Sequence, residues 1–119
     1  MQSQSNSINP SPEHQELFIA LQGLVHDATS PKWREPLANE SSFCGKQKVG
    51  EYAVSYEFGK SEIHGGWVLH LLITAPNGRE VMHATGRGQG DPLGKPESIS
   101  VYRADRLEMP SFQRALNAR

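Results

Sequence analysis

A run of alternating side chains between residues 51 and 58 constrains this chain more than any other feature. Large apolar residues alternate there with small or charged ones, which is the period-two pattern of a strand with one buried face. These large residues are Tyr52, Val54, Tyr56 and Phe58. The run from Trp67 to Thr74 is apolar on both faces, as expected of a strand in the middle of a sheet. The two runs therefore predict neighbouring strands.

A turn follows the second run. Ala75-Pro76-Asn77-Gly78 combines a proline, which presets φ, with an Asn-Gly pair that tolerates positive φ. This composition favours a short hairpin loop. Residues 79–85 then alternate again and predict a third strand. The sheet is expected to occupy residues 51–88 as an antiparallel meander.

The flanking segments predict helices. Ser11 can cap a helix that Pro12 begins, and an apolar stripe runs along residues 12–27. The stripe comprises Leu17, Leu21, Leu24 and Val25. Residues 1–10 are polar, lack periodicity and predict a disordered tail. The remaining residues, 11–119, are expected to form a single domain.

The C-terminal part allows two interpretations. Residues 98–102 alternate like a fourth strand, whereas Pro96 and Glu97 could open a helix. We favour a helical segment over residues 96–118, with a break at Pro110. The fold class is then α+β, with a central antiparallel meander of three strands, or four if residues 96–107 add one, and helices packed on one face.

Charge and cysteine content narrow the function classes. The chain has 12 basic and 13 acidic residues, a balance that argues against a protein coated in positive charge. Its one cysteine, Cys44, cannot form an internal disulfide, which favours a reducing compartment and predicts a cytoplasmic location. No secretory leader or long apolar run is found, so no membrane partner is expected.

The search for catalytic chemistry is mostly negative. The five histidines include no pair at metal-ligand spacing, and no serine lies in a nucleophile elbow. We therefore expect no cofactor, no metal and no catalytic residue, and binding is favoured over catalysis. His70 and His83 lie on neighbouring predicted strands. They leave open a small α+β enzyme or ligand binder with a pocket at these two residues.

Short motifs spread over residues 33–109 resemble a double-stranded RNA-binding domain. The matching segments are Pro36–Glu40, Glu51–Gly59, Gly59 with His64, Trp67, Asn77–Glu80 and Ala84–Gly88. The match is partial, because the second helix of that family begins with several lysines and this chain keeps only Lys95 there.

The resemblance implies contacts to two successive minor grooves of an RNA duplex and to the phosphates between them. It assigns Asn39 and Glu40 to the first minor groove, His64 and Lys60 to the second, and Lys95 with Arg87 or Arg103 to the phosphates. Only one lysine remains at the start of the segment that matches the family's second helix, and fewer phosphate contacts weaken nucleic-acid binding. The sequence therefore also fits an alternative function. That alternative is a protein-interaction module, a homodimer or a small inhibitor of a larger machine, which would use the 12–27 helix or the sheet face.

Overall fold

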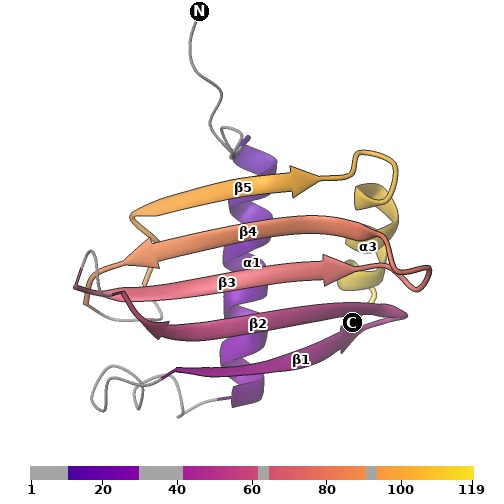
Figure 1. Cartoon of the computed structure of the whole chain (residues 1–119). Helices are drawn as coiled ribbons and strands as arrows, with labels where there is room; N and C mark the ends of the chain where they lie inside the picture. Colours follow the sequence, from indigo (N-terminus) through magenta and orange to yellow (C-terminus); the bar gives the residue numbers. More distant parts are fainter. Residues whose placement is uncertain (1–10, 30–41, 62–64, 91–93) are drawn as a thin grey trace, which may run out of the picture.

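The computed structural model describes residues 11–29, 42–61, 65–90 and 94–119. Five strands form one antiparallel sheet in the order β1-β2-β3-β4-β5 (Figure 1). The elements are α1 (Pro12–Thr29), β1 (Phe43–Val49), β2 (Tyr52–Lys60), β3 (Trp67–Thr74), β4 (Glu80–Gly88), β5 (Ser98–Ala104) and α3 (Met109–Asn117). The predicted α+β class with an antiparallel meander is confirmed, although the sheet is wider than predicted.

Helix α1 begins where the sequence predicts. The backbone N–H of His14 donates to the Ser11 hydroxyl at 3.2 Å, and the N–H of Gln15 donates to the Ser11 carbonyl. Ser11 therefore caps the helix, and Pro12 occupies the first turn, where its missing N–H costs nothing. The helix continues to Thr29, whose hydroxyl donates to the Val25 carbonyl at 2.7 Å.

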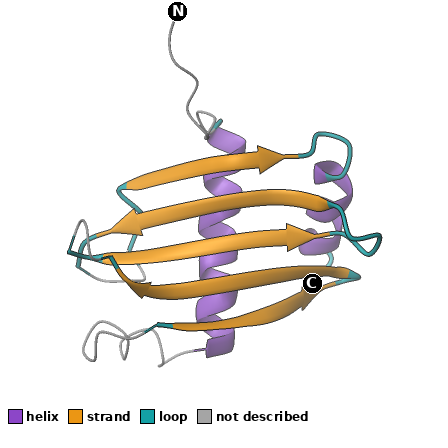
Figure 2. Ribbon diagram, viewed as in Figure 1, coloured by secondary structure: helices purple, strands orange, loops and turns teal. Residues whose placement is uncertain are grey.

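The core lies between the sheet and the two helices. Helix α1 crosses behind all five strands (Figure 2), and its apolar stripe is buried against them. The buried set from the helices is Leu17, Phe18, Leu21, Val25 and Phe112, and that from β2 and β3 is Tyr52, Val54, Phe58, Trp67, Leu69, Leu71 and Ile73. Among the residues predicted for the buried face of β2 and for the helix stripe, Tyr56 and Leu24 are only partly buried.

Helix α3 packs on the same face as α1. Its Phe112 ring meets the Tyr52 ring edge-on at 5.4 Å between centroids, and the Tyr52 hydroxyl donates to the Glu108 carboxylate at 3.1 Å. Burial, together with this hydrogen bond, raises the pKa of Tyr52. The helices thus cover a single face of the sheet.

The preferred helix over residues 96–107 is wrong, because this segment contains β5. Ile99 and Val101 lie opposite Gly86 and Ala84 of β4 and turn toward the helix side of the sheet. Pairing with β5 satisfies the backbone groups that β4 would otherwise leave at an open edge. Helical structure in this part of the chain is confined to α3.

Strand β1 was not predicted at all. It pairs with β2 from Phe43 opposite Phe58 to Val49 opposite Tyr52. Glycine and polar residues between these two ends hide the period-two pattern, as is common on an edge strand with a solvated face.

Candidate binding surface on the uncovered sheet face

The face of the sheet opposite α1 and α3 carries no helix among the described residues (Figure 1). Antiparallel sheets commonly leave one face in water, and its side chains follow from the strand register. One straight row crosses all five strands: Cys44, Glu57, His70, Thr85 and Ser100 lie opposite one another in turn. We call this side the uncovered face.

The centre of the row is a hydrogen-bonded pair. His70 Nδ1 and Thr85 Oγ1 share a hydrogen bond of 2.8 Å. Burial lowers the pKa of His70, against the opposing effect of the Glu57 carboxylate, while Arg87 and His83 lower it further. Burial of His70 therefore favours the neutral form of the imidazole. Thr85 is 1% exposed, so its hydroxyl is not accessible as a nucleophile.

His83 joins this group from β4. Its register partner is Leu72, so it lies diagonal to His70 rather than directly opposite. The two histidines and Glu57 help to line a cavity of about 160 Å³. That volume is below the roughly 300 Å³ at which small-molecule pockets begin. Among the described residues, no three His, Cys, Asp or Glu side chains could together hold a metal ion.

Basic side chains surround this centre. Lys46 and Lys48 lie on β1 opposite Ser55 and Ala53, and Arg87 lies on β4 opposite Val68. Arg103 of β5 lies opposite His83 and approaches Glu80 at 3.7 Å, an exposed contact of little energetic weight. The uncovered face is therefore locally basic although the chain as a whole has a net charge of −1.

An aromatic residue stands among these charges. Tyr102 is 36% exposed, and its ring centroid lies 5.0 Å from that of His83. The register between β4 and β5 shifts next to it, between His83 and Ala84, and such irregularities redirect side chains. Tyr102, Lys46 and Lys48 were not predicted as site residues. The alternation in residues 98–102 could have indicated the face of Tyr102, whereas the glycine and polar residues of 43–49 carry no such signal for Lys46 and Lys48.

The structure separates the predicted RNA-contacting residues. Lys60 ends β2, Arg87 is near the end of β4, and Lys95 precedes β5, so all three lie at one end of the antiparallel sheet. Arg103 lies toward the opposite end, and Lys60 projects to the helix side, as its partner Trp67 does. Asn39, Glu40 and His64 lie outside the described residues. The segment that the resemblance assigns to its second helix is β5.

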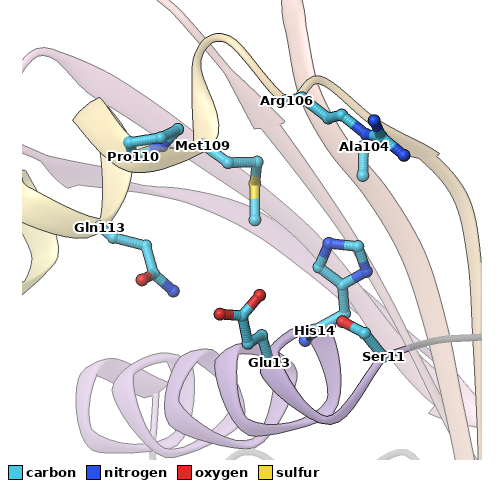
Figure 3. Close-up of a pocket in the computed structure, with 8 residues that line it drawn as sticks. All are labelled: Ser11, Glu13, His14, Ala104, Arg106, Met109, Pro110 and Gln113. Atoms are coloured by element: carbon cyan, nitrogen blue, oxygen red, sulfur yellow. Dashed lines mark hydrogen bonds between the residues drawn. The ribbon is translucent and has the colours of Figure 1, made fainter.

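A second hollow lies on the helix side, beside the end of β5. This cavity of about 600 Å³, here called the α1–α3 cleft, lies between the start of α1 and the start of α3 (Figure 3). Its lining residues are Ser11, Glu13, His14, Ala104, Arg106, Met109, Pro110 and Gln113. Figure 3 shows the side chains of Glu13, His14, Met109 and Gln113 converging on one space.

Comparison with protein-family models, with curated proteins and with solved structures gives no match. Within the described part of the chain, no helix is long and apolar enough to cross a membrane.

Proposed function

We propose that this chain is a non-catalytic RNA-binding module that binds single-stranded RNA on its uncovered face. The observation that carries the proposal is the exposed Tyr102 ring beside His83, with Arg103 next to it and other basic residues on the same face. Proteins that bind single strands combine aromatic platforms for the bases with basic grooves for the backbone.

The positions of the basic residues suit an extended single strand of RNA. Arg103 lies opposite His83, which is four residues from Arg87 along β4. By the strand rise of about 3.4 Å per residue, Arg87 and Arg103 are roughly 14 Å apart along the strand direction. Lys46 and Lys48 are on the far edge strand, across β2, β3 and β4. An RNA strand that crosses the sheet would meet basic side chains at the β1 edge and at the β5 edge, and the Tyr102 ring at the β5 edge.

The resemblance to double-stranded RNA-binding domains also supports RNA as the ligand. That family's duplex contacts depend on a basic second helix, whereas here β5 occupies the corresponding segment. The geometry therefore favours single-stranded over double-stranded RNA. Arg87 on the uncovered face and Lys95 just before β5 lie at the same end of the sheet, where they can contact phosphates.

The competing classes have less support. The stripe of α1 that a protein partner would need is buried against the chain's own sheet. The uncovered face is mostly polar, and its half-buried apolar residues, Val68 and Leu72, do not form a large apolar patch. Catalysis at His70 and His83 would need a larger cavity than the one present. A cytoplasmic location remains a prediction from the unpaired Cys44.

Fluorescence anisotropy with labelled oligonucleotides tests the proposal. The protein is titrated into a 12-nucleotide single-stranded RNA, the matching DNA strand and an RNA duplex of about 25 base pairs, long enough for the ~16 that a duplex-binding domain spans. Each titration is run at low and high salt. We expect the single-stranded RNA to bind most tightly and to be released by salt, because phosphate contacts exchange for counterions.

Variants locate the contact. Tyr102→Ala should weaken single-strand binding by about 1–3 kcal/mol, the usual effect of removing one stacking platform. Arg114→Ala is the control for loss of a positive charge away from the proposed contact, because Arg114 is exposed on α3, which packs on the other side of the sheet. Duplex preference that is insensitive to Tyr102→Ala would favour the duplex mode and contradict the sheet-face mode. Absence of binding to every RNA at low salt would contradict both.

A further inference from the structure

We infer that the α1–α3 cleft is a pocket for one unpaired guanine base of the bound strand. The inference rests on the proposed function and deepens it. The cleft begins where the uncovered face ends along β5. Tyr102 and Arg103 are on the edge strand, and Ala104 and Arg106 of the cleft follow them directly. Four residues of extended chain, from Tyr102 to Arg106, span at most about 14 Å. An RNA strand that passes Tyr102 and crosses the β5 edge of the sheet therefore reaches the cleft within a few nucleotides.

The size of the cleft suits a nucleotide. Its volume of about 600 Å³ lies inside the roughly 300–1,000 Å³ of small-molecule sites. One part of the lining is apolar, with Ala104, Met109 and Pro110. Another is polar and convergent, because Glu13, His14 and Gln113 point into the same space (Figure 3). A planar base with one polar edge matches a site of this composition.

The carboxylate of Glu13 discriminates between bases. An ionised carboxylate has two acceptor oxygens and no donor. The Watson–Crick edge of guanine presents two adjacent N–H donors, N1–H and N2–H₂, which one carboxylate accepts together. Adenine, cytosine and uracil each present one donor beside an acceptor, which would face a negatively charged oxygen. The amide of Gln113 can donate to the guanine O6.

His14 also lines the cleft, with its imidazole ring near the Glu13 carboxylate (Figure 3). An imidazole nitrogen donates or accepts a hydrogen bond according to the tautomer, so the ring adds a second polar group to this wall of the cleft. The Met109 thioether can lie against the face of the base, since sulfur packs well on aromatic rings. Arg106, exposed at the edge of the cleft beside Ala104, is placed to pair with a phosphate (Figure 3).

Isothermal titration calorimetry with GMP, AMP, CMP and UMP tests the pocket directly. We expect GMP to bind most tightly. Glu13→Gln replaces one acceptor oxygen by a donor and should weaken GMP binding about tenfold or more, the effect expected of losing a charged hydrogen bond. Glu16→Gln is the matched control, because Glu16 is exposed on the same helix and does not line the cleft. Its affinity for GMP should equal that of the unsubstituted protein. Equal binding of the four nucleotides, or none, would overturn the guanine pocket.

Two oligonucleotides separate this inference from the proposed function. One is a 12-nucleotide uridine strand, and the other carries a single guanine within it. Tyr102→Ala should weaken both, whereas Glu13→Gln should weaken only the guanine-containing strand. Binding of both strands with no effect of Glu13→Gln would overturn the pocket and leave the sheet-face function standing. GMP binding that Glu13→Gln abolishes, without binding of the uridine strand, would retain the pocket and overturn the sheet-face function.

Discussion

The Phe18 ring of α1 lies close to the backbone of β4 at Gly86, and replacing this glycine by alanine should destabilise the fold. A Cβ atom built on Gly86 lies 2.6 Å from two ring carbons of Phe18. Carbon atoms in ordinary contact are about 3.5–4.0 Å apart, so the ring or the helix would have to move by about 1 Å. The Phe18 ring is fully buried, which leaves it little freedom to move.

The size of the effect follows from two opposing contributions. Overpacking a tight core costs typically about 1–3 kcal/mol. A Gly→Ala change in an unstrained backbone gains about 0.4–1 kcal/mol by restricting the unfolded chain. We therefore expect Gly86→Ala to lower the free energy of unfolding by about 1–2 kcal/mol, and the Tm by roughly 4–8 °C for each kcal/mol. Urea denaturation followed by circular dichroism measures the first quantity, and a thermal melt measures the second.

Two further variants make the test specific. Gly23→Ala is the matched control, because Gly23 is exposed on α1 and a Cβ there meets nothing within 4 Å. It should raise stability by up to about 1 kcal/mol through helix propensity. Combining Gly86→Ala with Phe18→Leu should cost less than the sum of the two single changes, because the smaller side chain admits the new methyl group. Unchanged stability of Gly86→Ala, or strict additivity in the double variant, would refute the proposed contact.

The remaining predictions concern two titrating groups. Because burial lowers the pKa of His70 below its ordinary value of 6.5, its contribution to stability is present above that pH and is lost as the pH falls through the lowered pKa of the folded protein. Urea denaturation between pH 7.5 and pH 5 should show this loss, and an equal pH dependence in His70→Gln would contradict it. Asp105 accepts backbone hydrogen bonds from Leu107 at 2.9 Å and from Glu108 at 3.3 Å, and pairs with Arg79 at 2.7 Å. Asp105→Ala should lower the Tm more than Asp105→Asn, which keeps an acceptor for the backbone, and equal losses would assign the effect to the ion pair alone.

How far the sequence predicts this fold depends on how strongly each segment alternates. Strand β2 buries most of one face against the helices, so its large side chains follow a clear period of two. Strand β3 is apolar on both faces, and the Pro-Asn-Gly turn after it marks its end and the start of β4. Strands β1 and β5 are the two edge strands of the sheet, where polar residues are tolerated on either face. For β5, the Pro-Glu pair before it resembled a helix start, and pairing with β4 overrode that local preference.

The candidate site is less predictable than the fold. The sequence placed His70 and His83 on neighbouring strands, but only the register shows that they lie on a diagonal and that Thr85 is the direct neighbour of His70. A shift of one residue would have sent either side chain to the helix face. Glu13 and Gln113 line the same α1–α3 cleft, and no local pattern connects residues so far apart in the chain.

The strand order also has a consequence for how the chain reaches its folded state. Every strand of the sheet pairs with the strand adjacent to it in sequence, so each pairing step closes only a short loop. Folding rates rise as contacting residues come closer together in sequence, and a meander is the β topology with the shortest such separations. The long-range step is the docking of α1, which contacts β5 from the other end of the chain. We expect the hairpins to form early and the N-terminal helix to complete the core.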